Sequence, residues 1–510
     1  MIKDSTSIAN NDPSTLGSGQ KDTQTALKFI TCGSVDDGKS TLIGRLLVDS
    51  KAVLQDHLAG VQRQGETDLA LLTDGLSAER EQGITIDVAY RYFNTEDRKF
   101  IIGDAPGHEQ YTRNMVTAAS SADAAVVLVD ATKLDWPNPA LELLVQTRRH
   151  SLLCKLLRVP SIVFAVNKLD AVADAAAAFA HISRALHAFA GAAAIPVTAI
   201  VPISALKGWN VVDAAAQPRW CGYSGPTLLA LLEKLPATPA ETDLPFAFPV
   251  QWVEKPGAPT LPAARGSLDA AQPEATPLRP VQSCAGRLGA AGLSPTGADA
   301  PWSGPAGHRS SSADTSRGRR VFWGRVAAGA VLPGAQVQVF PSGQIATVVQ
   351  VLDHARRPKD IAAGHSAGIV LDREVDVSRG DWILAAPVET PVTADEFDAP
   401  APRPAWPASR ELSTTIAWMD DEPLIAGRVY WALQGHRWVK AKVRRIVHRL
   451  DVNTLEENDA KQLEPNAIGH VELVLQEPLP ITAYTRSRLL GALILVDTAS
   501  HKTSGAALVN

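Results

Sequence analysis

Short apolar runs alternate with longer amphipathic stretches between residues 27 and 235 of the chain. The short runs predict buried β-strands, and the longer stretches, in which apolar residues recur every three or four positions, predict helices that cover them. The predicted strands are residues 27–32, 99–103, 125–130, 162–167 and 197–202. The predicted helices are residues 39–49, 140–153, 173–190 and 226–234. This alternation indicates an α/β domain over residues 26–235, built on a mainly parallel sheet with helices on both faces.

A different pattern follows this domain. Residues 236–246 contain three prolines and indicate a linker. Beyond them, short runs alternate apolar and polar residues and are separated by glycine-marked turns, as in residues 248–253 and 344–352. Alternation with a period of two over such lengths is typical of small all-β domains. We therefore expect two β-barrels, over residues 247–392 and 410–510.

Two segments follow neither pattern. Residues 1–25 are rich in Ser, Asn, Asp and Gly, and they predict a disordered leader. Residues 255–319 contain nine prolines and almost no β-branched periodicity. Such a segment buries too little apolar surface to offset the entropy of ordering it. We expect a disordered insertion in a hairpin loop of the first barrel, where added length costs little stability.

Composition narrows the class of protein. The chain has 510 residues, 45% of them hydrophobic, which is enough for about three domains with sizeable cores. Its net charge of −5 weighs against a nucleic-acid surface. Without a signal peptide or an apolar run of ~18–20 residues, the sequence predicts a cytoplasmic protein with no membrane span. Four widely spaced cysteines indicate free thiols and no disulfide framework or zinc cluster: Cys32, Cys154, Cys221 and Cys284.

Candidate chemistry begins directly after the first predicted strand, where residues 33–40 match the phosphate-loop pattern G-x4-G-K-[ST]. A loop between a strand and a helix suits this pattern, because backbone N–H groups and the helix N-terminus both favour phosphate. Lys39 would neutralise the β- and γ-phosphates, and the Ser40 hydroxyl would bind Mg²⁺. The predicted phosphate-binding residues are Gly33, Ser34, Val35, Asp36, Asp37, Gly38, Lys39, Ser40 and Thr41.

A second motif, Asp104-Ala105-Pro106-Gly107, ends another predicted strand. Asp104 can hold a water bound to Mg²⁺, and the Gly107 N–H can meet the γ-phosphate. His108 follows directly and is the candidate for orienting the attacking water, so we expect it to be catalytic together with Lys39.

Thr85 lies between the phosphate loop and this second motif, within the sequence EQGITI. That position is where a mobile switch would complete the magnesium shell and sense the γ-phosphate. We therefore expect Thr85 to act in catalysis and as a magnesium ligand beside Ser40 and Asp104.

Two further motifs point to guanine. Asn167-Lys168-Leu169-Asp170 ends a strand, and an aspartate there can accept from guanine N1–H and the 2-amino group, which adenine does not offer. Ser204-Ala205-Leu206 follows the last predicted strand and would supply a backbone N–H to the guanine oxygen. Four motifs in this order predict a domain that binds and hydrolyses GTP, with Mg²⁺.

The motifs, together with Gly-Ile-Thr-Ile and Asp-Ala-Pro-Gly-His, resemble translational GTPases of the elongation factor Tu class. Further stretches are similar to the GTPase subunit of bacterial sulfate adenylyltransferase, the CysN/NodQ type. Two features depart from that family, since Ala105 stands where threonine is usual and residues 255–319 interrupt the first barrel. The matching stretches are residues 36–51, 74–93, 107–115, 146–151, 248–253, 418–424 and 452–456.

The resemblance implies an elongation factor Tu-like fold and a partner. In that family a separate small subunit forms adenosine 5′-phosphosulfate and pyrophosphate from ATP and sulfate, and GTP hydrolysis on the large subunit drives this uphill reaction. We therefore expect a heterodimer or a higher assembly, without nucleic acid. Two alternatives stay open from the sequence: a translation factor that delivers RNA, and a GTP-dependent scaffold without a catalytic partner.

Overall fold

The computed structural model describes residues 26–50, 62–63, 66–67, 88–108, 111–215, 217, 219–255, 319–387 and 403–510. The predicted leader, Thr85 and residues 256–318 of the predicted insertion lie outside these residues.

The α/β domain is built on a six-stranded sheet with the order β4-β5-β1-β6-β7-β8. Every neighbouring pair is parallel except β4 and β5, so the predicted mainly parallel sheet is confirmed. All residues of the central strands β6 and β7 are buried, as expected where helices cover both faces. The strands are β1 (Leu27–Cys32), β4 (Ala89–Asn94), β5 (Lys99–Asp104), β6 (Ala124–Asp130), β7 (Ser161–Asn167) and β8 (Val197–Pro202).

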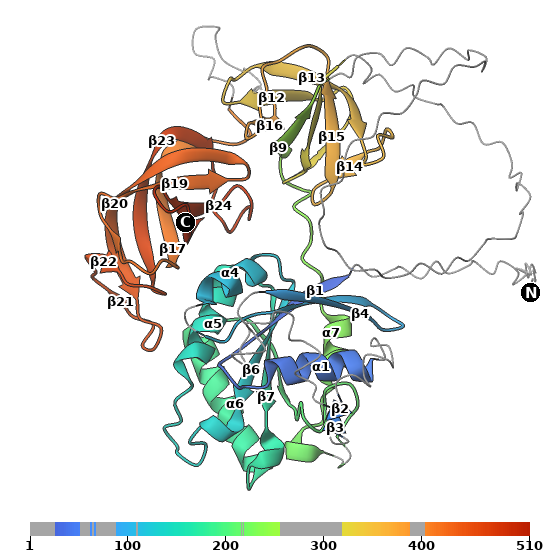
Figure 1. The fold of residues 1–510 in the computed structure, drawn as a ribbon, viewed down its shortest axis with the longest axis vertical. Coiled ribbons are helices and arrows are strands. Elements are labelled where there is room, and N and C mark those ends of the chain that lie inside the picture. The colour runs from blue at the N-terminus through green and yellow to red at the C-terminus, as the bar shows by residue number, and fades with distance from the viewer. Residues whose placement is uncertain are drawn as a thin grey trace, which may run out of the picture.

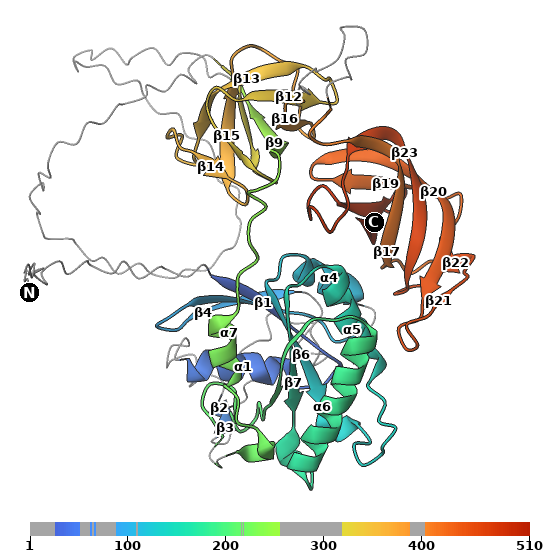
Figure 2. The same cartoon turned by 180° about the vertical axis from the view of Figure 1, so that it is seen from behind.

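Helices cover the two faces of this sheet (Figures 1 and 2). Val126 and Leu128 of β6 pack with α1 and α7 on one face, whereas Val127 and Val129 pack with α4, α5 and α6 on the other. The helices are α1 (Lys39–Asp49), α4 (Thr112–Ser120), α5 (Val145–Leu156), α6 (Ala175–Ala192) and α7 (Leu228–Lys234). Shorter elements are the 3-10 helices η3 (Ala131–Lys133), η4 (Leu169–Ala171) and η5 (Trp220–Gly222), and the strand pair β2 (Gln62–Arg63) and β3 (Glu66–Thr67).

The predicted helix over residues 140–153 is wrong at its start. Helix α5 begins at Val145, after Leu144 in an extended conformation (φ −58°, ψ 142°). A turn precedes this segment, since the N–H groups of Ala140 and Leu141 donate to the side-chain and backbone oxygens of Asn138 at 2.9 Å and 3.1 Å. The sequence patterns also missed α4 and the antiparallel edge strand β4.

The first barrel is closed, with strand order β10-β15-β13-β12-β16-β9. Its core consists of the inward apolar residues of these strands, such as Phe248, Phe322 and Ile369. The strands are β9 (Ala247–Glu254), β10 (Val321–Arg325), β12 (Gln336–Phe340), β13 (Ile345–Leu352), β15 (Ser366–Leu371) and β16 (Trp382–Ala385). A small pair, β11 (Ala330–Val331) and β14 (Ile361–Ala362), lies outside the ring.

The second barrel follows the order β19-β24-β25-β17-β23-β20, and pairing between β19 and β20 closes it. Its strands are β17 (Ala408–Trp418), β19 (Val429–Gln434), β20 (Arg437–Leu450), β23 (Ile468–Pro480), β24 (Ala492–Asp497) and β25 (Thr503–Val509). The short strands are β18 (Leu424–Ile425), β21 (Glu457–Asn458) and β22 (Gln462–Leu463). The expectation of an α/β domain followed by two all-β barrels is therefore confirmed.

The second barrel lies against helices α4 and α5 of the α/β domain (Figures 1 and 2). Arg113 of α4 donates to the backbone oxygen of Met419 at 3.3 Å, and Arg148 of α5 donates to that of Asn453 at 2.7 Å. The two barrels also touch, because Arg437 pairs with Asp381 at 3.0 Å. The α/β domain is thus in contact with the second barrel, in addition to its covalent connection through the linker.

Candidate functional site

The candidate site lies along the edge where the parallel strands of the α/β sheet end. Residues 33–40 follow β1, Asp104 ends β5, Asp130 ends β6 and Asn167 ends β7, while Ser204 comes two residues after β8. These strands are neighbours, so their carboxyl ends meet at one edge, which is the usual place for ligands in open α/β sheets. Motifs that are far apart in the sequence are thereby brought together.

The phosphate loop is tightly folded between β1 and α1. Gly33 (φ 147°) and Gly38 (φ 92°) adopt backbone conformations that residues with side chains disfavour. Space is restricted too, because a Cβ atom on Gly33 would lie 2.8 Å from the backbone oxygen of Leu128. A Cβ atom on Gly38 would lie 2.5 Å from Nδ2 of Asn167. Both glycines are therefore required, and the loop backbone lies directly against β6 and β7.

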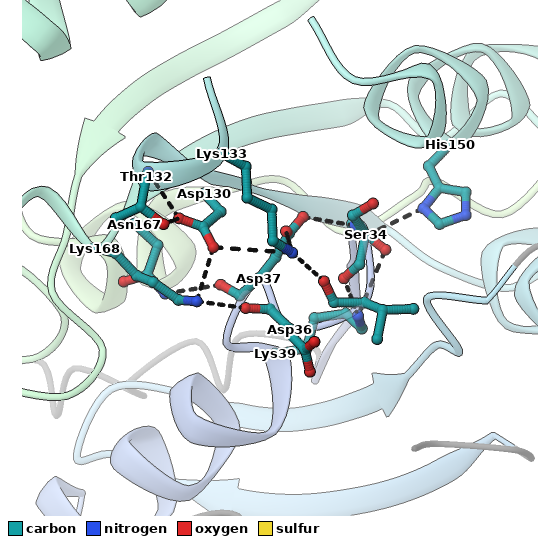
Figure 3. Close-up of polar contacts among 12 residues, drawn as sticks. Ser34, Asp36, Asp37, Lys39, Asp130, Thr132, Lys133, His150, Asn167 and Lys168 are labelled. Carbon is teal, nitrogen blue, oxygen red and sulfur yellow. Dashed lines mark hydrogen bonds and ion pairs between the residues drawn. The ribbon is translucent and has the colours of Figure 1, made fainter. Parts of the chain in front are cut away.

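Asp37 stabilises the loop from within. Its side chain is fully buried, and Oδ2 accepts a hydrogen bond from the Ser34 N–H at 2.6 Å. Oδ1 forms an ion pair with Nζ of Lys133 at 3.0 Å (Figure 3). Burial raises the pKa of Asp37, and Lys133 opposes that rise. The Asp37 carboxylate is thus directed at protein groups and fixes the shape of the loop.

Lys39 lies in the first turn of α1 and is only 7% exposed. Its ammonium donates to the backbone oxygen of Ser34 at 2.7 Å and contacts that of Gly33 at 3.5 Å. Burial lowers the pKa of Lys39, whereas the nearby carboxylates of Asp104 and Asp37 raise it. A buried ammonium that is bound chiefly to neutral carbonyls is stabilised further by an anion. Phosphate oxygens fit this requirement.

The motif after β5 is anchored beside β1. The carboxylate of Asp104 is 3% exposed and accepts a hydrogen bond from the Thr31 hydroxyl at 3.2 Å. The Ala105 N–H donates to the backbone oxygen of Thr31 at 3.1 Å. Ala105 itself is fully buried and packs into the core on the face of the sheet that α4, α5 and α6 cover. Its methyl group therefore fills core space.

Gly107 and His108 lie next to the phosphate loop. A Cβ atom on Gly107 would lie 2.5 Å from Nζ of Lys39 and 3.0 Å from the backbone oxygen of Ser34. A side chain at this position would displace the Lys39 ammonium and press on the Ser34 backbone, which favours glycine. The next residue, His108, is exposed, and its backbone oxygen accepts a hydrogen bond from the Tyr111 N–H at 3.1 Å.

Asn167 joins the phosphate loop to both predicted guanine motifs. Its Nδ2 donates to the backbone oxygen of Asp37 at 2.9 Å, and its Oδ1 accepts from the Ala205 N–H at 2.9 Å. Asp170 follows in the 3-10 helix η4 and is partly exposed. The amide of one buried residue thus fixes the spacing of three loops.

The Ser204-Ala205-Leu206 segment is held by helix α1. Arg45 donates to the backbone oxygens of Ala205, at 3.2 Å, and Leu206. Ser204 and Ala205 are buried, whereas the Leu206 side chain is 65% exposed. The Ser204 hydroxyl accepts from the Lys207 N–H at 3.1 Å and so closes the turn.

Two lysines and one aspartate brace the outer side of the phosphate loop (Figure 3). Nζ of Lys168 lies 2.7 Å from Oδ2 of Asp130 and donates to the backbone oxygen of Asp36 at 2.6 Å. Nζ of Lys133 donates to the backbone oxygen of Val35. The sequence reasoning missed Asp130 and Lys133. The sequence contained one indication of Asp130, because it is a polar residue at the end of an apolar strand, as are the last residues of β5 and β7.

His150 is a further residue at the site that sequence reasoning did not assign. It belongs to α5, is 1% exposed, and accepts a hydrogen bond at Nδ1 from the Gly33 N–H at 3.1 Å. Burial, followed by Lys39 and Arg149, lowers the pKa of His150 to about 3. His150 lies within residues 146–151 (QTRRHS), one of the stretches that match the family, but the sequence does not show its contact with the phosphate loop.

Of the predicted magnesium ligands, Ser40 lies in the first turn of α1 and Asp104 at the end of β5, while Thr85 is outside the described residues. Within the described ranges, no group of three His, Cys, Asp or Glu residues could hold a metal by itself. In the same ranges no helix is long and apolar enough to cross a membrane. Cys32, Cys154 and Cys221 are free and buried.

Two protein-family models match the chain. Residues 24–237 match the elongation factor Tu GTP binding domain, and residues 411–510 match the GTP-eEF1A C-terminal domain-like family. Among solved structures, sup35 complexed with GDP aligns with 97% of each chain at 18% identity, with a TM-score of 0.36. That score is too low for a comparison of the domain arrangement.

Two relatives match nearly the whole chain. Sulfate adenylyltransferase subunit 1 of Laribacter hongkongensis is 38% identical over 496 residues, which cover 96% of this chain and 86% of the relative. The bifunctional enzyme CysN/CysC of Xylella fastidiosa is 41% identical over 497 residues, and the chain spans 66% of its length. The chain therefore belongs to the family of sulfate adenylyltransferase subunit 1, and its α/β domain is a GTP-binding domain of the elongation factor Tu type.

Proposed function

We propose that this chain uses GTP hydrolysis to drive sulfate activation on a partner. The partner is a small catalytic subunit that forms adenosine 5′-phosphosulfate and pyrophosphate from ATP and sulfate. The observation that carries the proposal is the bridge made by Asn167, because it joins the loop proposed to bind phosphate to the Ser204–Leu206 segment proposed to bind guanine. Family membership supplies the sulfate reaction.

The phosphate end of the site fits a triphosphate. Lys39 would meet the β- and γ-phosphates, and the backbone N–H groups of residues 33–41 would surround them at the N-terminus of α1. The buried ammonium of Lys39 and the close approach of Gly107 both support this role. Asp37, Lys133 and Lys168 would act indirectly by holding the loop in shape.

Ser40, Thr85 and Asp104 would hold Mg²⁺, Asp104 through a water molecule. When bound, the ion would neutralise charge that develops on the phosphates. The buried carboxylate of Asp104, oriented by Thr31 and close to Lys39, fits a position beside a hydrated cation. His108 would orient the attacking water, because it follows Gly107 directly and is accessible to solvent.

Guanine would be selected by Asp170, with backbone help from residues 204–206. The position of Asp170, three residues after the bridging Asn167, supports this assignment. The alternative of a translation factor that delivers RNA is disfavoured, because relatives that match 96% of this chain are sulfate adenylyltransferase subunits.

The test is phosphosulfate formation by the complex with its cognate small subunit. We would measure phosphosulfate accumulated from ATP and sulfate at long times, with and without GTP, for the wild type and Lys39→Ala. For the wild type, GTP should raise the phosphosulfate yield above the equilibrium yield reached without GTP. For Lys39→Ala, GTP should make no difference to the yield, because this variant lacks the ammonium that meets the phosphates. A wild-type yield that ignores GTP contradicts the proposed coupling, and retained GTP hydrolysis would leave the GTPase assignment intact.

A further inference from the structure

The first peptide of the phosphate loop is held by a histidine from a distant helix. His150 lies 117 residues after Gly33, and its Nδ1 accepts the Gly33 N–H at 3.1 Å (Figure 3). The other side of Gly33 faces Leu128. A Cβ atom placed on Gly33 would lie only 2.8 Å from the backbone oxygen of Leu128. The loop therefore leaves β1 between β6 on one side and α5 on the other.

The protonation state of His150 matters for this contact. An imidazole nitrogen accepts a hydrogen bond only when it carries no proton, so the observed geometry requires the neutral ring with its proton on Nε2. The charged groups that face the ring favour this state, because Lys39 and Arg149 both repel an imidazolium. Burial acts in the same direction and is the larger cause of the lowered pKa, about 3.

Two consecutive N–H groups of the loop are bound by side chains in this way. His150 accepts from Gly33, and Asp37 accepts from Ser34 at 2.6 Å. Ser34 in turn offers its backbone oxygen to Lys39 at 2.7 Å. A change in the orientation of the Gly33 peptide would therefore be transmitted to the ammonium that is proposed to bind phosphate.

We propose that His150 is a positioning residue of the nucleotide site, which holds the Gly33 peptide so that the phosphate loop is shaped for GTP before GTP binds. This role rests on the proposed GTP site. His150 touches neither nucleotide nor attacking water in this scheme, so it acts on them only through the loop backbone and Lys39. The acceptor atom is what matters, and a side chain of similar volume without an acceptor cannot replace it.

The experiment compares His150→Asn, which keeps an acceptor near the position of Nδ1, with His150→Leu, which keeps volume and removes the acceptor. An unpaired buried N–H favours other loop conformations, so His150→Leu should bind GTP about 5- to 100-fold more weakly by calorimetry. His150→Asn should stay within about threefold of the wild type, because its acceptor is retained.

A matched control is His181→Leu, since Nδ1 of His181 lies 2.8 Å from the backbone oxygen of Trp136, away from the phosphate loop. This variant should bind GTP as the wild type does. A second measurement does not depend on whether the variants fold: the ¹⁵N spectrum of histidine-labelled wild type should show a His150 ring that is neutral at pH 6 and protonated on Nε2.

Equal GTP affinity of wild type and His150→Leu would overturn the role of His150 alone. A proton on Nδ1 at pH 6, or equal weakening by Asn and Leu, would overturn it as well. A wild-type protein that binds no GTP would instead overturn the proposed function, and this role with it.

Discussion

Single residues at the nucleotide site act mostly by fixing the positions of other residues. Asn167 is the clearest case, since its amide joins Asp37 to Ala205 and lies so close to Gly38 that no side chain fits between them. Asn167 is constrained in this way, and the residue proposed to select guanine is Asp170, which is partly exposed.

Asp170→Asn should change the nucleotide preference. Guanine offers two donors to a carboxylate, whereas xanthine offers a donor and an acceptor that suit an amide. We expect weaker GTP binding and stronger xanthosine triphosphate binding, each by tenfold or more, since a mismatched pair of hydrogen bonds costs on the order of 1–3 kcal/mol. Isothermal titration with both nucleotides measures this, and Asp174→Asn, in the helix cap of α6, serves as the control. Equal ATP and GTP affinity in the wild type would contradict the guanine assignment.

At the scale of elements, strand pairing explains how the first barrel accommodates a long interruption. Strands β9 and β10 are antiparallel neighbours, with Glu254 opposite Val321 and Trp252 opposite Trp323. The two ends of residues 255–319 therefore meet at one rim of the barrel. The ring β10-β15-β13-β12-β16-β9 closes through this pair.

Deleting residues 257–316 and bridging the ends with a short Gly/Ser turn should leave the barrel folded. The ends already lie opposite each other, and loop-closure entropy changes slowly with length, so we expect the melting temperature to stay within about 5 °C. Differential scanning calorimetry measures the shift. Phe322→Ala, in the barrel core, is the positive control and should cost about 3–5 kcal/mol. Unfolding of the first barrel in the deletion variant would show that the segment packs against it.

At the scale of the whole molecule, helix α5 connects the nucleotide site to the second barrel. His150 of α5 contacts the phosphate loop. Just beyond the end of α5, the backbone oxygen of Leu157 accepts a hydrogen bond from the Tyr484 hydroxyl at 3.1 Å. Arg158 donates to the backbone oxygen of Tyr484 at 2.6 Å, and Arg488 donates to that of Arg158. The hydrogen bonds from Tyr484 and Arg488 satisfy carbonyl groups just beyond the end of the helix.

Tyr484→Phe should loosen the docking of the second barrel on α5. Tyr484 is 6% exposed, so losing its hydroxyl leaves the Leu157 oxygen without this donor, at a cost of about 1–2 kcal/mol. Hydrogen exchange should become faster for the amides near residues 155–160. Tyr223→Phe removes a hydroxyl that donates to the backbone oxygen of Pro226 within the α/β domain, and it should leave those amides unchanged. Identical exchange in Tyr484→Phe and wild type would contradict the docking role.

The sequence by itself determined the features that depend on neighbouring residues. The apolar runs specify β1 and β8 to the residue, and the phosphate-loop pattern specifies the start of α1, because strand burial and loop glycines act locally. The fold class and the family followed from such motifs and are confirmed. The start of α5 was predicted wrongly, since a turn at residues 138–141 and the extended Leu144 precede the first helical residue. The roles of the individual site residues and the boundaries of the domains stay predictions.

Only the tertiary structure decided which distant residues support the site. Asp130, Lys133 and His150 reach the phosphate loop because the ends of adjacent parallel strands, and the helix that covers them, converge at one edge of the sheet. The neutral state of His150 also depends on the fold, because burial and nearby cations lower its pKa. The sequence does not show how close two residues 117 positions apart will lie, or how deeply they will be buried. The fold decides both, and it places His150 against the phosphate loop.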